Sequence, residues 1–182
     1  MTKEELRKWI RGEKKKITLA EKQQRSESIW QQIEKNEQFR AAEVVLLYWS
    51  MADEVYTHDF VKRWADKKTL LLPVVDGDNL RIKPYRGINN MVISEQFGIG
   101  EPTGDDYNDL TKITVIIVPG VAFDKNRNRM GRGRGYYDKL LSTNNAYKIG
   151  VGFDFQIVEQ VPIEEFDIPM DCVVSESETY NV

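Results

Sequence analysis

Apolar side chains recur along the chain in two patterns, and segments with the two patterns alternate. Recurrence with the helical period indicates an amphipathic helix, and an unbroken apolar run between turn residues indicates a buried strand. The helical pattern predicts helices at Lys3–Lys16, Leu19–Asn36 and His58–Lys67, and a further helix after Gly135. The strand pattern predicts strands at Val44–Trp49, Thr69–Val75, Arg81–Tyr85, Ile113–Val118, Lys148–Phe153 and Asp171–Val174.

The alternation of helical and strand segments indicates a layered α/β domain. Several strands are continuous apolar runs, which suit a mostly parallel sheet covered on both faces. At 182 residues, one domain is the default expectation. We therefore expect residues 1–182 to form a single three-layer domain with helices on both faces of the sheet. The stretch from Tyr85 to Asp109 is rich in Gly, Asn and Asp, and we expect a long loop with short elements there.

The charge balance narrows the class of protein. With 26 basic and 29 acidic residues the net charge is −3, so the chain has no general attraction for nucleic acid. The sequence has no apolar run long enough to span a membrane, and it opens with a charged helix rather than a signal region. These features favour a small cytoplasmic enzyme, which we expect to be a monomer without a nucleic-acid or membrane partner.

The single cysteine and the single histidine limit the chemistry further. Cys172 has no partner for an intrachain disulfide, and its valine neighbours favour core packing over a nucleophilic role. His58 is expected in the first turn of a helix, with Thr57 as its cap. One cysteine and one histidine are too few to supply the ligands of a usual zinc site.

Three further assignments concern packing and solvation. Trp9 and Trp30 lie at helical spacing with apolar neighbours, so we expect both in the core. The run from Lys14 to Lys16 is expected to be a solvated helix end, where cations suit the helix dipole. Asp53 is expected to serve as a turn or cap residue.

The segment from Val118 to Leu141 carries most of the chemistry that the sequence suggests. Gly131, Gly133 and Gly135 lie between a buried strand and the start of a helix. Such glycines let backbone N–H groups approach an anion, and the helix start adds its positive dipole end. Four cations belong to the same loop: Lys125, Arg129, Arg132 and Arg134. The pattern predicts a phosphate site that is neither a dinucleotide fingerprint nor a Walker A loop; the alternative is a tight turn with solvated arginines.

This segment closely resembles the signature of the 5-formyltetrahydrofolate cyclo-ligases, also called methenyltetrahydrofolate synthetases. That signature joins a Pro-Gly-x-x-Phe-Asp stretch to Arg-Leu-Gly-x-Gly-x-Gly-Tyr-Tyr-Asp. The matching residues are Pro119, Gly120, Phe123, Asp124, Arg129, Gly131, Gly133, Gly135, Tyr136, Tyr137 and Asp138. Met130 replaces a leucine, and Arg127 stands where family members often carry a turn-favouring glycine.

Two further segments extend the resemblance over nearly the whole chain. Residues 3–7, Lys-Glu-Glu-Leu-Arg, resemble the family's basic opening helix, whose cations reach the nucleotide phosphates. Residues 49–57, Trp-Ser-Met-Ala-Asp-Glu-Val-Tyr-Thr, resemble the segment that carries a folate-contacting glutamate, which maps onto Glu54. Residues 97–102 resemble, more loosely, a stretch that lines the folate pocket.

The resemblance implies ATP- and Mg²⁺-dependent cyclisation of 5-formyltetrahydrofolate to 5,10-methenyltetrahydrofolate, with release of ADP and phosphate. Transfer of the γ-phosphoryl group to the formyl oxygen would make that oxygen a good leaving group, after which the N10 amine attacks. Phosphoryl transfer depends on positioning and charge neutralisation, which explains the residue types in the loop.

The resemblance also assigns site residues. The ATP-binding residues would be Lys3, Glu4, Glu5, Leu6, Arg7, Arg129, Met130, Gly131, Arg132, Gly133, Arg134, Gly135, Tyr136 and Tyr137. Among these, the expected catalytic residues are Arg132, Arg134 and Tyr136. The expected substrate-binding residues are Trp49, Met51, Glu54 and Phe97. The expected Mg²⁺ ligands are Asp138 and Asp171.

Several of these assignments have a plainer alternative. Phe97 either stacks on the pterin or anchors its loop. Trp49 and Met51 either hold the pterin ring or pack in the core, although open α/β sheets place ligands at strand ends of this kind. The hydroxyls of Tyr136 and Tyr137 are either functional or structural. Asp171 is either a metal ligand or a strand-start carboxylate.

Two other functions use the same features differently. A relative of sugar-phosphate isomerases or acyl-CoA transferases would share the α/β layers, because fold alone does not decide function. An RNA-binding module would use the arginine-glycine loop, although the rest of the chain lacks interleaved basic and aromatic surfaces. ATP dependence separates the ligase from both alternatives.

Overall fold

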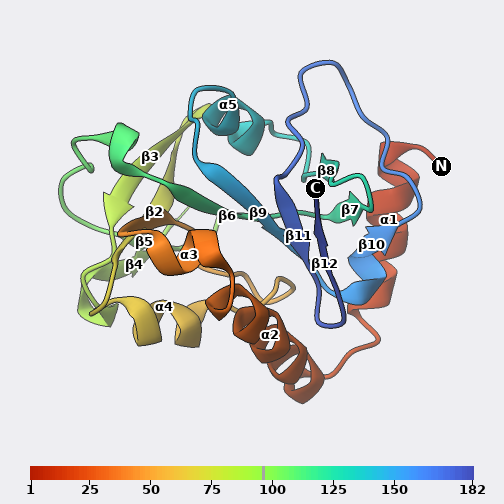
Figure 1. The fold of residues 1–182 in the computed structure, drawn as a ribbon, viewed down its shortest axis with the longest axis horizontal. Helices are drawn as coiled ribbons and strands as arrows, with labels where there is room; N and C mark the ends of the chain where they lie inside the picture. The colour runs from red at the N-terminus through yellow and green to blue at the C-terminus, as the bar shows by residue number, and fades with distance from the viewer. Residues whose placement is uncertain (96) are drawn as a thin grey trace.

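The computed structural model describes residues 1–95 and 97–182. Its centre is a seven-stranded sheet with the strand order β12-β11-β9-β6-β1-β2-β3 (Figure 1). The strands are β1 (Val44–Leu46), β2 (Thr69–Asp76), β3 (Asn79–Pro84), β6 (Val115–Pro119), β9 (Tyr147–Val151), β11 (Cys172–Val174) and β12 (Thr179–Asn181). The strands from β11 to β2 are parallel, whereas β3 and β12 pair antiparallel with their neighbours at the two edges.

The winding of the sheet changes direction beside β1. Val45 lies opposite Leu70 of β2 on one side and opposite Val115 of β6 on the other. The chain leaves β1 toward β2 and reaches β6 only later, so the strand order reverses between β1 and β6. Open α/β sheets bind ligands outside the carboxyl ends of their strands at such a reversal. The topology therefore points to the ends of β1 and β6 as the place of a site.

The α-helices of the described residues are α1 (Lys3–Lys14), α2 (Leu19–Glu34), α3 (Glu37–Ala41), α4 (His58–Trp64) and α5 (Tyr136–Ser142). Polar side chains start the first three by accepting a backbone hydrogen bond. Thr2 accepts from the Glu5 N–H, and Thr18 and Asn36 cap α2 and α3 in the same way.

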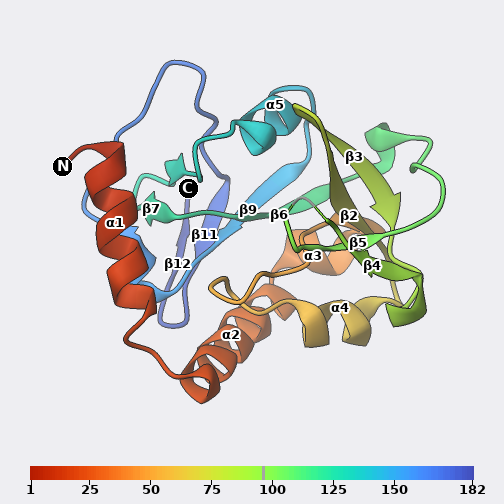
Figure 2. The same ribbon diagram turned by 180° about the vertical axis from the view of Figure 1, so that it is seen from behind.

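Residues that alternate along the strands pack into two apolar cores, one on each face of the sheet. On one face Val45 packs with Trp30 of α2 and Phe60 of α4, whose rings stack at 4.3 Å between centroids. Figures 1 and 2 show α2, α3 and α4 grouped together, with α5 apart from them. On the other face Leu46 packs in a cluster with Leu141 of α5 and with residues of irregular segments, such as Ala146 and Met170. One helix and irregular segments therefore cover this second face, in place of the expected layer of helices.

Short strands form two smaller sheets. The strands β7 (Ala122–Asp124), β8 (Arg129–Met130) and β10 (Ile157–Val158) make one, and β4 (Met91–Ile93) and β5 (Gly100–Pro102) make the other. Helix α1 lies beside β7 and packs through Leu6 and Ile10 against Ala122 and Met130 (Figure 2). Single 3-10 turns lie at Ile88–Asn90, Leu110–Lys112 and Asp154–Gln156. The strands β4 and β5 and the turn at Ile88–Asn90 lie within Tyr85–Asp109, where a long loop with short elements was expected. The remaining short elements carry no periodic signal, so the sequence did not predict them.

The turn between β7 and β8 contains the residue that departs from the family signature. Arg127 has φ of 68°, and it is the only non-glycine residue with positive φ among those described. The Asp124 carboxylate stabilises this turn by accepting hydrogen bonds from the Asn126 and Asn128 N–H groups, both at 3.0 Å. A glycine adopts a left-handed conformation without the steric cost that a side chain incurs, so arginine is strained at this position.

The expected α/β class with a mostly parallel sheet is confirmed. Trp30 and Cys172 are buried, as predicted. Trp9 is 43 % exposed, so its predicted place in the core is wrong, because α1 turns other residues toward its neighbours. Thr57 does not cap α4, since its hydroxyl accepts a hydrogen bond from the Ser50 N–H instead. The described part of the chain contains no helix that is long and apolar enough to cross a membrane.

Candidate active site

A cavity of about 610 Å³ opens at the carboxyl ends of β1 and β6, where the strand order reverses. Tyr48 and Trp49 follow β1 and line one wall, and Pro119 and Gly120 lie at the end of β6. The glycine loop, the β2–β3 hairpin, the β4–β5 loop, α1, the start of α5 and the irregular segment before β11 also line the cavity. The cavity therefore lies where an open α/β sheet is expected to bind its ligand.

The predicted phosphate loop forms one side of this cavity. Gly131, Gly133 and Gly135 all line it, and the loop leads directly into α5. Gly133 and Gly135 have φ of 107° and 73°, in the left-handed region where a side chain is strained. The Nε–H of Arg7 in α1 donates to the Gly131 carbonyl at 3.1 Å. The N-terminal helix is thus joined to the glycine loop, although the two are far apart in the sequence.

The three arginines of the loop have different surroundings. Arg129 is buried, donates through Nε to the Pro119 carbonyl at 2.7 Å and lies 5.1 Å from the centroid of the Tyr137 ring. The Arg134 guanidinium lies 4.8 Å from the centroid of the Phe97 ring. Arg132, whose side chain is 50 % exposed, forms an ion pair with a carboxylate on another loop. Arg129 is therefore fixed in the wall, and the other two cations are accessible from the cavity.

Helix α1 contributes two of its five expected ATP-binding residues to the cavity. Lys3 and Arg7 line it, and the Lys3 ammonium lies 3.5 Å from a Glu164 oxygen and 3.7 Å from an Asp167 oxygen. The structure does not bring Glu4, Glu5 or Leu6 to the cavity. The Glu5 side chain accepts from the Thr2 N–H in the capping box at 2.8 Å, and Leu6 is buried against β7 and β8.

Tyr136, Tyr137 and Asp138 begin α5 and all line the cavity. The Tyr136 hydroxyl donates to the Gly77 carbonyl in the β2–β3 turn at 2.9 Å, which holds the hairpin against α5. In this conformation the Tyr136 hydroxyl has a structural partner, so its predicted catalytic role has no support from the hydrogen bonds. Burial raises the pKa of Tyr137 far above its ordinary value, so this residue keeps its proton.

The structure does not bring Asp171 to Asp138. The Lys148 N–H donates to the Asp171 carboxylate at 2.8 Å, and the Asp171 N–H donates to the Lys148 carbonyl at 2.9 Å. Lys148 lies near the amino end of β9, whereas the cavity is at the carboxyl end of the parallel strands. The prediction that both carboxylates bind one ion is therefore wrong for this structure, and Asp171 has the strand-start role instead.

A single carboxylate beside the phosphate loop still fits magnesium. No group of three His, Cys, Asp or Glu side chains that could hold a metal occurs within residues 1–95 and 97–182. Protein Mg²⁺ sites commonly use one or two carboxylates, with substrate phosphates and water as the other ligands. Asp138 meets this requirement because it lines the cavity next to the glycines.

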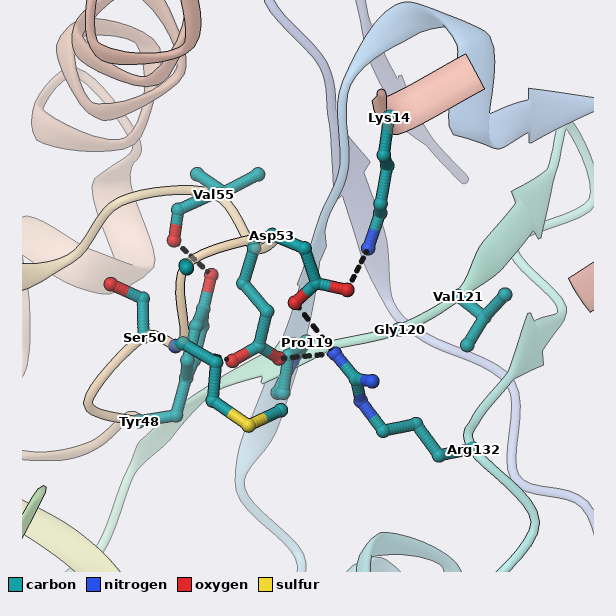
Figure 3. Close-up of polar contacts among 12 residues, drawn as sticks. Lys14, Tyr48, Ser50, Asp53, Val55, Pro119, Gly120, Val121 and Arg132 are labelled. Atoms are coloured by element: carbon teal, nitrogen blue, oxygen red, sulfur yellow. Dashed lines mark hydrogen bonds and ion pairs between the residues drawn. The ribbon is translucent and has the colours of Figure 1, made fainter. Parts of the chain in front are cut away.

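The other side of the cavity is built from the connection between β1 and α4. Two reciprocal hydrogen bonds of 2.9 Å join Ser50 and Thr57, each N–H donating to the hydroxyl of the other residue. The buried Tyr48 hydroxyl donates to the Val55 carbonyl at 3.0 Å (Figure 3). These buried bonds fix the backbone of the segment that carries the expected folate ligands.

Within that segment, Glu54 is held in a defined place. Its side chain is 13 % exposed, and one carboxylate oxygen accepts from the Met51 N–H at 2.8 Å. Burial raises the pKa of Glu54, and this effect outweighs the hydrogen bond from Met51 and the nearby charge of Arg132. A buried carboxylate with one hydrogen bond from the protein retains acceptor capacity for a ligand.

Aromatic side chains form the apolar part of the same wall. The Trp49 ring stacks on His58 at 3.7 Å and on Tyr85 at 5.8 Å between centroids. Gly100 allows this close packing, because a Cβ there would lie 2.5 Å from the Trp49 ring. Trp49, Met51 and Phe97 line the cavity together with Glu54, so the structure brings all four expected substrate-binding residues together.

The model of the 5-formyltetrahydrofolate cyclo-ligase family matches residues 1–176 of the chain. The chain belongs to this family. A protein of Escherichia coli K12 named 5-formyltetrahydrofolate cyclo-ligase is 34 % identical over 76 % of this chain and 81 % of its own length. A Caenorhabditis elegans protein named probable 5-formyltetrahydrofolate cyclo-ligase is 28 % identical and covers 97 % of this chain and 94 % of its own.

Solved structures agree with this family membership. Aquifex aeolicus 5,10-methenyltetrahydrofolate synthetase is 31 % identical, with a TM-score of 0.89, and the match covers 100 % of this chain and 93 % of the other. The members named above are ligases, which decides against the isomerase and RNA-binding alternatives.

The sequence missed several residues of the cavity. The additional lining residues include Tyr48, Pro73, Val75, Leu80, Glu164, Phe166 and Asp167, whereas Ile99 and Glu101 belong to the stretch 97–102 that was expected to line the pocket. Most of the missed residues lie on the β2–β3 hairpin or in the irregular segment before β11. No local pattern marks these positions, because only the tertiary arrangement brings their loops to the carboxyl edge of the sheet.

Proposed function

We propose that this protein catalyses the ATP- and Mg²⁺-dependent cyclisation of 5-formyltetrahydrofolate to 5,10-methenyltetrahydrofolate, with release of ADP and phosphate. The observation that carries the proposal is that one cavity has both required surfaces. A glycine loop with arginines lines one side, and a buried carboxylate with aromatic rings lines the other. A nucleotide, bound through its phosphates, and a folate, bound through its ring, can therefore occupy this cavity side by side.

The nucleotide occupies the side formed by the glycine loop and α1. Backbone N–H groups of the loop and the cations Arg7, Arg134 and Lys3 neutralise the triphosphate charge. Lys3 exchanges its carboxylate partners for phosphate oxygens when the nucleotide arrives. Asp138 would help to hold Mg²⁺, which when bound supplies charge neutralisation at the phosphates.

The folate occupies the side formed by the β1–α4 connection. The Glu54 carboxylate accepts hydrogen bonds from polar N–H groups of the substrate, and Trp49 and Phe97 pack on its ring. A fixed carboxylate and fixed rings orient the formyl group before reaction, which lowers the entropic part of the barrier.

The reaction then takes place between the two bound substrates. The formyl oxygen attacks the γ-phosphorus as the bond to the bridging oxygen of ADP breaks, giving a phosphorylated formyl intermediate. The N10 amine attacks the formyl carbon, its proton is lost, and phosphate leaves as the five-membered ring closes. Arginines positioned at the transferring group stabilise the charge that develops.

The test is product formation by the purified protein. Methenyl product, followed by its near-ultraviolet absorbance, should appear only when ATP, Mg²⁺ and 5-formyltetrahydrofolate are all present. Conversion that continues undiminished without ATP, or no conversion under any condition, would refute the proposal. We also propose that the protein acts as a cytoplasmic monomer, which size measurement in solution and localisation of a tagged protein test.

A further inference from the structure

Three charged residues from distant parts of the sequence meet beside the candidate active site. Lys14 is the last residue of α1, Asp53 lies in the β1–α4 connection, and Arg132 belongs to the glycine loop (Figure 3). The Arg132 guanidinium donates to Asp53 Oδ1 at 3.0 Å, and the Lys14 ammonium lies 3.6 Å from Asp53 Oδ2. Each of the two Asp53 carboxylate oxygens thus contacts a different cation.

Lys14 does not behave as the solvated helix end that its sequence predicts. Its side chain is 9 % exposed, whereas the side chain of Lys16 is 69 % exposed. Burial lowers the pKa of Lys14, and the charge of Asp53 opposes that effect. Because a buried ammonium is costly unless it is paired, the contact with Asp53 is what makes this position tolerable for lysine.

Asp53 is likewise more than a turn residue. Burial alone would raise its pKa, but the charges of Lys14 and Arg132 outweigh burial and hold the pKa of Asp53 below its ordinary value. The carboxylate therefore stays ionised and keeps both cations in place.

The cluster controls where Arg132 points. Its guanidinium is 3.0 Å from Asp53 and 4.0 Å from a Glu54 oxygen, so it lies between two carboxylates and favours the first. Without the charge of Asp53, the nearest carboxylate is Glu54, the expected folate ligand. Arg132 would then move onto Glu54 and compete with the substrate for it.

We propose that Lys14 and Asp53 are positioning residues, which hold Arg132 at the boundary between the nucleotide and folate sides of the cavity and keep it off Glu54. The inference rests on the proposed function. Arg132 lines the cavity, whereas Lys14 and Asp53 do not, so these two residues act through Arg132. Their loss should therefore lower kcat and weaken folate binding, with little change in the affinity for ATP.

The variants Asp53→Asn, Lys14→Met and Lys14→Arg test this inference, with Lys15→Met as the matched control. The Lys15 side chain is exposed at the end of the same helix. We expect Asp53→Asn to lower kcat about tenfold, which is the scale expected when one positioned charge is misplaced. Lys14→Met should lower kcat by a smaller factor. Lys14→Arg keeps the positive charge and should retain most of the wild-type kcat, and Lys15→Met should leave kcat unchanged.

A double-mutant cycle separates positioning from general stability. In an Arg132→Ala background, Asp53→Asn should cause no further loss of kcat, because the residue that it positions is already absent. Equal losses in both backgrounds, or normal kcat in Asp53→Asn, would overturn the inference. An inactive wild-type protein would instead refute the proposed function, so the two failures are distinguishable.

Discussion

The two sides of the cavity are held by different kinds of interaction. On the folate side, buried hydrogen bonds fix the chain, as between Ser50 and Thr57 and between Tyr48 and Val55. On the proposed nucleotide side, Lys3 is held by ion pairs and Arg134 by a ring contact, beside glycines in left-handed conformations. One side is preformed, and the other has partners that a charged ligand can replace.

The energetics explain this division. Breaking a buried hydrogen bond leaves an unsatisfied group and costs roughly 1 to 3 kcal/mol, so the folate side resists rearrangement. Exposed ion pairs contribute only about 0 to 1 kcal/mol, so phosphate oxygens can displace the exposed Glu164 carboxylate from Lys3 at little cost. We therefore expect the ATP triphosphate to bind to a surface whose ion pairs rearrange, and the folate ring to bind to a surface that is already in place.

The strongest test removes the charge at the centre of the preformed side. Glu54→Gln keeps the size and deletes the charge, so it should weaken folate binding by about ten- to a hundredfold, the equivalent of one charge-assisted hydrogen bond. The melting temperature and the ATP affinity should change little. Asp66→Asn, an exposed carboxylate after α4, is the control. Direct binding titrations with each substrate measure the effect, and normal folate affinity in Glu54→Gln would break the comparison.

The second test asks which carboxylate serves the metal on the adaptable side. Asp138 lines the cavity, whereas Asp171 is bonded to Lys148 at the opposite edge of the sheet. Asp138→Asn should raise the Mg²⁺ concentration for half-maximal activity about tenfold, the effect of losing one charged ligand of roughly 1.4 kcal/mol. Asp171→Asn should lower the melting temperature and leave that Mg²⁺ midpoint unchanged. A shifted midpoint in Asp171→Asn would show that the metal is bound elsewhere than the cavity geometry indicates.

The third test uses the replaceable partners of Lys3. In the double variant Glu164→Gln with Asp167→Asn, Lys3 no longer has to leave two carboxylates before it binds phosphate. ATP affinity should rise about two- to fivefold, on the scale of the exposed Lys3–Glu164 ion pair. The gain should disappear at high salt, which screens the pairs in the wild type as well. Weaker ATP binding in this variant would mean that the carboxylates help to hold the nucleotide.

The fourth test concerns pH and has the smallest expected signal. Because burial raises the pKa of Glu54, its charged form is lost at a higher pH than for an ordinary glutamate. Folate affinity should therefore fall on acidification from that higher pH, and Glu54→Gln should lack this fall. Stability moves the other way: the Glu54 contribution is present below the unfolded-state pKa and is lost as pH rises through the raised value. Binding and unfolding curves of both proteins, taken over the same pH range, check both signs.

The sequence predicted the parts of this molecule that have local signals. Unbroken apolar runs marked the central strands, and the glycine–arginine pattern marked a loop that lines the cavity. The prediction was wrong for Lys14 because helix amphipathicity does not reveal that the end of α1 meets a distant loop. It was wrong for Asp171 because a carboxylate before a strand looks the same whichever edge of the sheet it reaches.

The position of β1 also has a consequence for how the chain folds. This strand is the middle of the site, yet β6, which forms its second neighbour, comes from far along the chain. Contacts between distant segments form slowly, because the closure of the intervening loop must come first. Until β6 arrives, one edge of β1 is apolar and unpaired, and such edges are prone to wrong pairing. The crevice at the ends of β1 and β6 therefore cannot form before β6 arrives, and the newly made chain is vulnerable at this edge until then.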